Sequence, residues 1–435
     1  MNQAHHVVVV GGGFGGLYAA NALRKAPVRV TLLDRRNFHL FQPLLYQVAT
    51  GSLSPANIAA PLRSVLRRQR NARVLLAEVS GFDLAGRRVL LVDGDPIPYD
   101  TLIVAAGVRH HYFGHPEWEK HAPGLKSLED ATDMRRRILL AFEQAERSPD
   151  PEARRGLLTF VVVGGGPTGV ELAGALGDLA RTTLRYDFRD IDPRTARVLL
   201  LEATDRILTT YPPKLSARAV RSLEKLGVTV RTGTVVTDVR HGGVMVKAGS
   251  QTEHIRAHTV LWGAGVQASP LAKMLADATG AALDRAGRIV VQPDLSLPGR
   301  PEVFVLGDMA NYAHQTGQPL PGVAPVAMQQ GSYVAALIER RLAGAGPGLQ
   351  ATPQRPFRYR DRGSMATIGP SAAVADLGWI RFGGFLAWAA WLFIHLIYLV
   401  QFQNRVLVLF QWAWNYFTRG RSARLITGED KDRCA

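Results

Sequence analysis

The sequence predicts an α/β protein with two Rossmann-like dinucleotide-binding domains, the second inserted in the first, and a C-terminal helical membrane-association segment. Two strand–glycine turn–helix patterns, beginning at Val7 and at Thr159, predict the two domains. An aromatic and apolar stretch that begins at Phe382 predicts the last segment. The expected boundaries are 1–120 and 266–345 for the first domain, 121–265 for the second, and 346–435 for the C-terminal segment.

The composition is that of a globular protein, with 47% apolar and 20% charged residues among 435. A net charge of +16 suggests an anionic neighbour, either nucleic acid or a lipid surface, unless it only reflects an arginine-rich genome. The single cysteine, Cys434, excludes a disulfide framework, a cysteine-rich metal site and a redox-active cysteine pair, and we expect no metal. Because a strand already begins at Val7, we expect no secretory signal and a chain that starts in the cytosol.

The first pattern opens with the β-branched run 7–10, which is typical of a buried parallel strand. Gly11, Gly13 and Gly16 then fit G-x-G-x-x-G before a helical stretch. In this motif the first glycine makes the tight turn, the second admits a pyrophosphate, and the third lets helix and strand pack closely. A second strand ends in Asp34, 18 residues after Gly16, where a carboxylate can accept hydrogen bonds from a ribose.

The second pattern repeats these parts. The strand 159–163 precedes Gly164, Gly166 and Gly169, and a later strand ends in Glu202. The interval from Gly169 to Glu202 is 33 residues, so the polar stretch 181–194 is interpreted as a surface insertion. A carboxylate would repel a 2′-phosphate and therefore favours NADH, although Arg206 lies nearby.

The repeat predicts a resident flavin dinucleotide on one pattern and a visiting nicotinamide dinucleotide on the other. The alternative is that one pattern is a vestigial structural copy. Both patterns keep their glycines and their acidic residue, which favours two working sites.

Two later strands, at 99–107 and 259–265, end in small residues, and a third, at 303–308, ends in Gly-Asp. With the first glycine turn, these ends resemble the flavoproteins that have two dinucleotide-binding domains. The stretches 37–51, 166–174 and 324–331 are more specific, and they are similar to type II NADH:quinone oxidoreductases, the single-subunit, non-pumping NADH dehydrogenases. The resemblance covers essentially the whole chain.

The resemblance implies FAD and NADH as the dinucleotides and a membrane quinone as the electron acceptor. Glu171 would lie where flavin and nicotinamide meet, and Gln329 near the quinone, as the catalytic residues. The expected FAD contacts are Gly11, Gly13, Phe14, Gly15, Gly16, Asp34, Arg35, Val79, Ala106, Gly107, Asp308, Ala324 and Pro325. The expected NADH contacts are Gly164, Gly166, Pro167, Thr168, Gly169, Glu202 and Gly265.

One position departs from the family's A-Q-x-A-x-Q-x-G signature. Pro325 replaces the first glutamine and removes both a side-chain amide and a backbone donor. The other assignments have simpler alternatives. Glu171 could be a first-turn helix glutamate, Gln329 an ordinary polar helix residue, and Asp308 a helix N-cap.

The C-terminal stretch 383–400 has 18 residues, of which only His395 is polar, a length at the threshold for a membrane span. A polar stripe on the following helix, opposite Trp, Tyr and Phe, instead favours a helix that lies in the membrane interface. We expect Arg419, Arg421 and Arg424 to meet anionic lipid headgroups. A dimer helix and a true span are the alternatives. His395 could donate a proton to quinone, but a hydrogen-bonded helix histidine is the simpler interpretation.

These observations predict FAD-dependent oxidation of NADH with two-electron transfer to quinone and without proton pumping. The family implies a peripheral homodimer at the cytoplasmic face of a bacterial inner membrane. Sulfide:quinone and disulfide reductases need redox cysteines, which one cysteine cannot supply. A soluble NAD(P)H-dependent reductase of a ferredoxin-type protein or of oxygen is the enzyme alternative. A redox-sensing or nucleic-acid-binding flavoprotein ranks lower, because no nucleic-acid-reading module is present and we expect no nucleic acid partner.

Overall fold

The computed structural model describes residues 4–344 and 355–428. The chain divides into two compact units, and Cys434 lies outside the described residues. The first unit comprises Met1–Leu40, Ala59–Arg109 and Val266–Asp361, and the second comprises Phe41–Ile58, His110–Gly265 and Arg362–Ala435.

The first unit is built on a six-stranded sheet of described residues, in the order β20-β21-β9-β1-β2-β5. All neighbours are parallel except β20 and β21, and β1 pairs with β2 from His5–Val28 to Val10–Leu33. The central strands are apolar and buried, as expected of a parallel sheet covered on both faces. Their bounds are β1 His5–Val10, β2 Val28–Asp34, β5 Ala72–Leu76, β9 Thr101–Val104, β20 Ser296–Leu297 and β21 Arg300–Val305.

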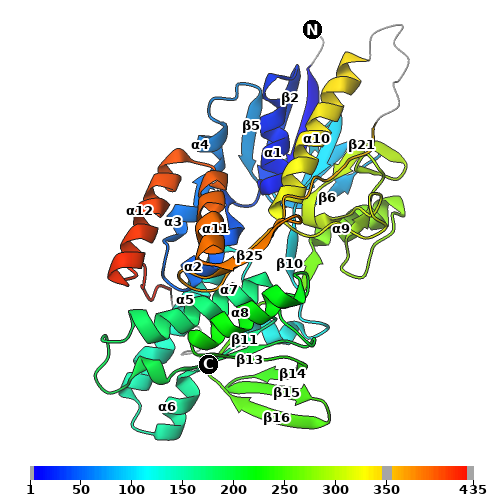
Figure 1. Ribbon diagram of the computed structural model, residues 1–435. Coiled ribbons are helices and arrows are strands. Elements are labelled where there is room, and N and C mark those ends of the chain that lie inside the picture. The colour runs from blue at the N-terminus through cyan, green and yellow to red at the C-terminus, as the bar shows by residue number, and fades with distance from the viewer. Residues whose placement is uncertain (1–3, 345–354, 429–435) are drawn as a thin grey trace. The chain divides into compact units, whose positions relative to one another are not determined.

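Two helices of this unit run side by side, α1 (Phe14–Ala22) and α10 (Ala324–Ala343), as Figure 1 shows in blue and yellow. Their close approach depends on Gly331, where a side-chain carbon would lie 2.4 Å from the carbonyl oxygen of Gly15. The unit also contains β3 Phe38–Leu40, β4 Ala59–Pro61, α4 Leu62–Leu66, β6 Val79–Asp83, β7 Arg88–Leu91, β8 Ile97–Pro98 and α9 Pro270–Thr279.

The second unit contains a four-stranded parallel sheet of described residues, in the order β13-β12-β11-β17. Its core includes Trp118, Trp262 and the apolar side chains of a separate antiparallel sheet, β14-β15-β16. The bounds are β11 Thr159–Val163, β12 Arg197–Leu201, β13 Val228–Arg231, β17 Thr259–Trp262, β14 Thr234–Arg240, β15 Gly243–Ala248 and β16 Gln251–Arg256. The helices of this part are α5 Leu128–Arg147, α6 Pro151–Leu157, α7 Pro167–Asp178 and α8 Pro213–Lys225.

The C-terminal residues of the second unit form a small antiparallel sheet and two helices. The sheet consists of β23 Ser364–Thr367, β24 Ala373–Asp376 and β25 Arg381–Gly384. The helices are α11 Phe385–Tyr398 and α12 Phe402–Thr418, drawn in orange and red in Figure 1. The short helices α2 Leu45–Ala49 and α3 Pro55–Ile58 belong to the same unit.

Only part of the apolar stretch 383–400 is helical. Its first two residues belong to β25, and α11 ends at Tyr398. Within residues 4–344 and 355–428, no helix combines the length and the apolar character needed to cross a bilayer. The polar stripe of α12 faces the protein: Asn404 donates to the Ala56 carbonyl at 3.3 Å, and Asn415 donates to the Ser52 carbonyl at 3.0 Å.

Candidate functional site

The first glycine-rich turn has the close backbone contacts that the motif predicts. Gly11 has φ +102°, and a side-chain carbon there would lie 2.4 Å from the Ala105 carbonyl oxygen. A side-chain carbon at Gly16 would lie 1.9 Å from the Gly11 carbonyl oxygen, so α1 rests directly on the turn. At Gly13, the N-cap of α1, an added carbon would meet nothing within 4 Å. The turn therefore leaves open space where a pyrophosphate is expected.

Asp34 is fixed at the end of β2 by two backbone donors. The Gly12 N–H lies 2.6 Å from one carboxylate oxygen, and the Arg36 N–H lies 2.7 Å from the other. Burial raises the pKa of Asp34, although both hydrogen bonds and the neighbouring arginines lower it. The carboxylate is thus oriented beside the turn, with lone pairs left for a ribose.

The structure adds a residue to this site that the motif did not indicate. His39 is 1% exposed, its Nδ1 lies 2.9 Å from the Gly12 carbonyl oxygen, and its ring meets Phe14 edge-on at 5.0 Å. His39 is part of the stretch 37–51 that carried the family resemblance, but periodicity alone did not separate it from a polar strand residue.

Asp308 lies in the single turn Gly307–Met309 after β21, not at a helix N-cap. The Gly307 N–H donates to the side-chain oxygen of Gln330 at 2.6 Å, and Gln330 is 1% exposed. The sequence pattern predicts a role for Gln329 but not for its neighbour Gln330, because a buried glutamine gives no signal in the helical period.

The helix α10 begins at Ala324, as expected, with Val323 as its N-cap. Pro325 occupies the first turn, where its missing N–H removes no helix hydrogen bond. Gln329 holds the backbone of Arg360: its amide donates to the Arg360 carbonyl and accepts from the Arg360 N–H, both at 3.0 Å. Both polar atoms of Gln329 therefore already have partners.

The other predicted FAD residues lie in the same unit. Arg35 is exposed, Gly15 is buried in α1, and Val79 begins β6. The Ala106 N–H lies 3.2 Å from the Met309 sulfur, a weak hydrogen bond, and Gly107 has open space beside it.

The second glycine-rich turn repeats the geometry of the first. Gly164 has φ +104°, and a side-chain carbon there would lie 2.8 Å from the Ala264 nitrogen. A side-chain carbon at Gly169 would lie 1.8 Å from the Gly164 carbonyl oxygen. Gly166 is the N-cap of α7 and has nothing within 4 Å, while Pro167 occupies the first turn of the helix. Thr168 and Gly169 follow Pro167 in α7, and Gly265 follows β17 with a positive φ.

Glu202 repeats the role of Asp34. One carboxylate oxygen accepts the Gly165 N–H at 2.6 Å, and the other accepts the Thr204 N–H and hydroxyl, both at 2.8 Å. Arg206 is engaged elsewhere, because its guanidinium donates to the carbonyls of Tyr211 and Thr209 at 2.6 and 2.8 Å. This arrangement leaves the glutamate as the charged group beside the turn and favours the NADH interpretation.

Glu171 is the fifth residue of α7, so it lies beyond the first turn that the simpler alternative required. Its carboxyl lies 3.4 Å from the Thr367 N–H. Burial raises the pKa of Glu171 to about 8, although the Thr367 N–H lowers it. Burial and the nearby Glu171 also raise the pKa of Tyr46 well above its ordinary value. A carboxyl with this pKa holds a proton at neutral pH and is able to release it.

A chain of side-chain hydrogen bonds joins Tyr46 to the C-terminal helix. The Gln47 amide donates to the Tyr46 hydroxyl at 2.8 Å, and the Trp412 indole donates to the Gln47 side-chain oxygen at 2.7 Å. Trp412 belongs to α12. The last helix therefore supplies Trp412 to the hydrogen-bonded side chains near Glu171. Spacing in the sequence did not predict this contribution.

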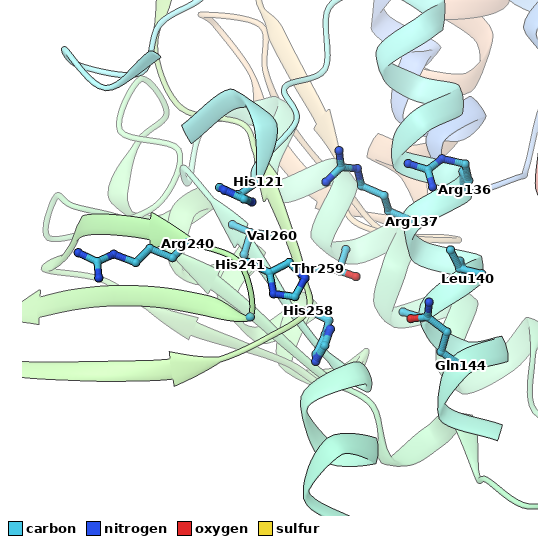
Figure 2. Close-up of a pocket in the computed structure, with 12 residues that line it drawn as sticks. His121, Arg136, Arg137, Leu140, Gln144, Arg240, His241, His258, Thr259 and Val260 are labelled. Atoms are coloured by element: carbon cyan, nitrogen blue, oxygen red, sulfur yellow. The ribbon is translucent and has the colours of Figure 1, made fainter. Parts of the chain in front are cut away.

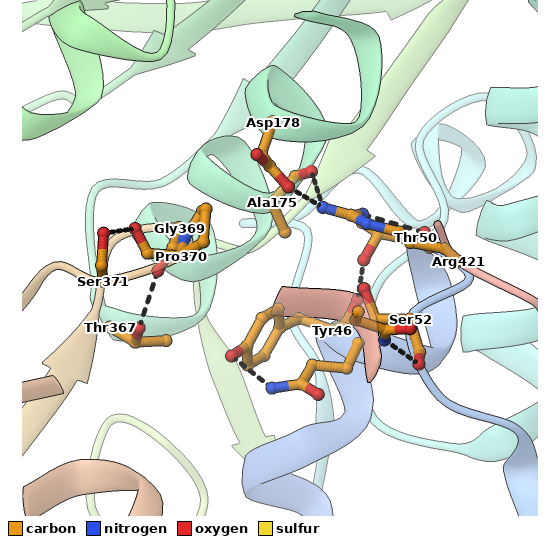
Figure 3. A network of polar contacts seen from close by, with 12 residues as sticks. Tyr46, Thr50, Ser52, Ala175, Asp178, Thr367, Gly369, Pro370, Ser371 and Arg421 are labelled. Carbon is orange, nitrogen blue, oxygen red and sulfur yellow. Dashed lines mark hydrogen bonds and ion pairs between the residues drawn. The ribbon is translucent and has the colours of Figure 1, made fainter. Parts of the chain in front are cut away.

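Arg421 joins the same region to α7. Its guanidinium forms an ion pair with Asp178 and donates to the carbonyls of Thr50 and Ala175 at 3.1 and 3.3 Å. Figure 3 shows Arg421 pointing at Asp178 and Ala175 on one side and at Thr50 on the other. Arg424 pairs with Asp187. The expectation that these two arginines meet lipid headgroups is therefore wrong for Arg421, which is 7% exposed, and Arg424 already has a carboxylate partner.

His395 fits the simpler interpretation. Its Nδ1 lies 2.7 Å from the Trp391 carbonyl oxygen, and the two rings stack with centroids 4.2 Å apart. Burial lowers the pKa of His395 to about 4, although the hydrogen bond to Trp391 raises it. The imidazole is therefore neutral at physiological pH.

The second unit also has a cavity of about 280 Å³ that is not the nucleotide site. It lies at Thr259 and Val260, the amino end of β17, whereas Gly265 follows the carboxyl end of the same strand. None of the predicted NADH residues lines it. Figure 2 shows three histidines and Arg137 around this cavity.

Comparison with known families gives matches over most of the chain. Residues 5–331 match the family described as pyridine nucleotide-disulphide oxidoreductase, and residues 362–422 match the NDH2 C-terminal domain. The type II NADH:quinone oxidoreductase Ndh of Mycobacterium tuberculosis is 49% identical over 431 residues, which cover 98% of this chain and 91% of that protein.

Solved structures share the fold. NDH2 from Plasmodium falciparum in complex with NADH has a TM-score of 0.85 at 18% identity, covering 98% of this chain and 100% of that chain. The sulfide:quinone oxidoreductase of Aquifex aeolicus has a TM-score of 0.69 at 19% identity, covering 92% of each chain. The second similarity shows that this fold also carries other quinone chemistry, so the function is decided by the site residues.

Proposed function

The chain belongs to the type II NADH:quinone oxidoreductases of the pyridine nucleotide-disulphide oxidoreductase family, and from this membership we propose that it oxidises NADH and reduces a membrane quinone. The overall reaction consumes NADH, one proton and quinone, and yields NAD⁺ and quinol. The observation that carries the proposal is the pair of glycine turns, in each of which a carboxylate accepts the N–H of the residue after the first motif glycine, Gly12 or Gly165, at 2.6 Å.

The residues of the first unit fit FAD. The open space at Gly13, the oriented carboxylate of Asp34 and the buried, unpartnered Nε2 of His39 all suit a dinucleotide. FAD, when bound, accepts a hydride from NADH and passes two electrons to quinone. The chain's own contribution is to hold the dinucleotide through the α1 N-terminus, Asp34 and the turn at Asp308.

The residues of the second unit fit NADH. The N-terminus of α7 faces the open space at Gly166, and its free N–H groups favour a pyrophosphate. Glu202 accepts from the ribose hydroxyls and repels a 2′-phosphate. Arg206 is held in its own loop and does not offset that repulsion.

Glu171 is the proton-holding group in this proposal. Its pKa of about 8 keeps the carboxyl protonated at neutral pH, so a proton is available when quinone takes up electrons. Gln329 acts as a positioning residue, because both atoms of its amide hold Arg360. The Tyr46–Gln47–Trp412 hydrogen bonds fix the side chains near Glu171.

Quinone is an apolar substrate that resides in the bilayer, so we further propose that the chain associates peripherally with the membrane through α11 and α12. The polar stripe of α12 contacts the protein, and the opposite face presents large apolar side chains to the outside. On α11 and α12 together, the large apolar side chains that are more than half exposed are Phe385, Leu386, Phe393, Phe402, Phe410, Trp414 and Phe417. We also propose a homodimer on the cytoplasmic face of a bacterial inner membrane, which sedimentation of the detergent-solubilised protein would test.

The proposed function is tested by anaerobic mixing of the flavin-loaded protein with NADH or NADPH, followed by quinone or oxygen. We expect rapid bleaching of the flavin absorbance by NADH, slow bleaching by NADPH, and rapid reoxidation by quinone. Reoxidation by oxygen but not by quinone would replace the proposal with a soluble NAD(P)H-dependent reductase.

A further inference from the structure

Both backbone polar groups of Gly12 are fixed by side chains. Its N–H donates to Asp34 at 2.6 Å, and its carbonyl oxygen lies 2.9 Å from His39 Nδ1. Because a carbonyl oxygen only accepts, Nδ1 carries the proton. In the second turn the Gly165 N–H likewise meets Glu202, but the Gly165 carbonyl accepts from the backbone N–H of Leu208 at 2.8 Å. A side-chain donor to the turn is therefore particular to the first unit.

The imidazole of His39 has one polar atom left. Burial lowers the pKa of His39, although the hydrogen bond to Gly12 raises it, so the ring is neutral and Nε2 is an acceptor. Nε2 is buried and has no hydrogen-bond partner among residues 4–344 and 355–428. A buried acceptor without a partner is destabilising. A ligand bound at the turn can supply the missing donor, because the same ring contacts both Gly12 and Phe14, the first residue of α1.

We propose that His39 is an FAD-binding residue whose Nδ1–H holds Gly12 and whose Nε2 accepts a hydrogen bond from the bound dinucleotide. The donor is a hydroxyl, the adenine amine or the flavin N3–H, since the ionised phosphates and the flavin carbonyls cannot donate. This inference rests on the proposed FAD site in the first unit.

Three substitutions separate the two roles. The amide nitrogen of Asn can occupy the place of Nδ1, so H39N keeps the donor to Gly12 and lacks the second acceptor. The amide of Gln reaches the place of Nε2, so H39Q keeps an acceptor and lacks the donor to Gly12. H39F keeps the ring and its edge contact with Phe14 but removes both polar atoms. H6N is the matched control, because His6 is another buried histidine of this unit and bonds Thr31 and Arg29 instead.

Flavin release from the holoprotein is followed by the rise in flavin fluorescence, with circular dichroism as a check of folding. We expect H39N and H39Q each to release FAD about three- to tenfold faster than the wild type, and H39F faster than either. H6N should match the wild type. If H39N releases FAD at the wild-type rate, the hydrogen bond from Nε2 to FAD is overturned. If all three variants release FAD at the wild-type rate, His39 has no role in FAD binding. A wild-type protein that holds no FAD would instead overturn the proposed function.

A separate observation concerns the cavity of the second unit. Its lining residues include His121, His241 and His258, whose neighbouring rings meet edge-on with centroids 6.5 and 6.0 Å apart. Arg136, Arg137 and Arg240 also line it, and none of the twelve described lining residues is acidic. No group of three His, Cys, Asp or Glu side chains in the described residues is placed to hold a metal ion. The cavity therefore presents N–H donors and positive charge without a metal site.

Nearby carboxylates offset much of the fixed charge. Arg136 and Arg137 share Asp133, with contacts of 2.8 Å each, and Arg240 pairs with Asp238 at 2.5 Å. Burial lowers the pKa of His258, and His241 and Arg256 lower it further. Arg256 itself pairs with Glu152. The fixed charges nearly balance, so an anion in the cavity would be held mainly by the N–H donors of the imidazole and guanidinium groups that line it.

We infer that this cavity binds multivalent oxyanions of the sulfate or phosphate class. The inference is independent of the proposed function, because the cavity lies at the opposite end of β17 from Gly265.

Sulfate is the suitable probe, because it stays a dianion near neutral pH and its own protonation does not change. Calorimetric titration of the flavin-loaded protein, with NAD⁺ present to fill the nucleotide site, should show one saturable site for sulfate. H241L/H258L removes two imidazole N–H donors and should weaken sulfate binding about tenfold. R194Q, which removes an exposed guanidinium paired with Asp192, is the control and should bind sulfate as the wild type does. An absence of saturable sulfate binding, or a double variant that binds sulfate like the wild type, would overturn the inference.

Discussion

Asp34 and Glu202 each lie at the end of a strand and bind the backbone N–H of a turn residue, Gly12 or Gly165. Substitution of either carboxylate therefore affects the turn as well as the ribose contact. Each carboxylate accepts a glycine N–H at 2.6 Å while keeping lone pairs for a ribose. Replacement by alanine would free that N–H and alter the turn together with the ribose contact. Replacement by the matching amide keeps one acceptor oxygen for the glycine N–H, removes the charge and turns the other oxygen into an NH2 donor.

The charge of Glu202 should decide between NADH and NADPH. We expect Glu202→Gln to raise the ratio of kcat/KM for NADPH to that for NADH by about tenfold, because the charge that repels the 2′-phosphate is lost. Glu152→Gln is the control, since Glu152 is an exposed carboxylate of the same unit that pairs with Arg256. Steady-state kinetics with both nucleotides measures the ratio. An unchanged ratio would show that Glu202 does not read the ribose.

Glu171 gives a prediction about stability and pH. Its folded pKa of about 8 lies above the ordinary value of 4.5, so between these pH values the folded protein keeps a proton that the unfolded chain releases. This group's contribution to the free energy of unfolding therefore falls as the pH rises from about 4.5 to about 8, by a few kcal/mol. Glu171→Gln should lack this fall. Thermal unfolding near pH 6 and near pH 9 compares the two proteins, and parallel profiles would contradict the raised pKa.

At the scale of elements, the two strand–turn–helix patterns could be predicted because their signals are local. The motif predicts both the positive φ of Gly11 and an acidic residue at the end of the next strand, and both lie within a few tens of residues of each other. Contacts between distant segments left no such signal. Arg421 and Asp178 are 243 residues apart, and the pairing exists only because the end of the chain packs on α7. The polar stripe of α12 was visible as a pattern, but whether it faced water or protein depended on that packing.

The Arg421–Asp178 ion pair gives a prediction for α7 and the C-terminal residues together. Both groups are buried, so removal of one leaves the other without its partner. We expect Arg421→Met and Asp178→Leu each to lower the free energy of unfolding by about 3–5 kcal/mol, and the double variant to lose less than either. Urea unfolding followed by tryptophan fluorescence measures this.

The control for that cycle is Arg194→Gln, which removes the exposed partner of Asp192 and should leave the unfolding midpoint unchanged. Additive losses in the double variant would show that the two buried groups do not interact. The same contacts explain why removal of the whole C-terminal segment is a poor test of membrane binding: truncation would also leave Asp178 without Arg421 and Gln47 without Trp412.

At the scale of the whole molecule, charge and apolar surface contribute differently to membrane association. The net charge of +16 favours an anionic surface, but Arg421 and Arg424 are already paired with carboxylates. The exposed aromatic side chains of α12 lie on the face away from the protein, because the polar stripe of this helix makes the contacts with the protein. Binding should therefore depend on apolar insertion more than on headgroup charge.

Substitution of three exposed residues tests this without disturbing the protein contacts of α12. Phe402, Phe410 and Phe417 are 77%, 70% and 82% exposed, and we expect their joint replacement by serine to release most of the protein from vesicles. Tyr186→Ser, at a 73% exposed aromatic residue outside these helices, is the control and should bind as the wild type does. Flotation with neutral and with anionic vesicles separates apolar insertion from electrostatic attraction to the headgroups. If the triple variant still binds anionic vesicles fully, electrostatic attraction holds the protein at the membrane and the apolar face of α12 is not the membrane-binding surface.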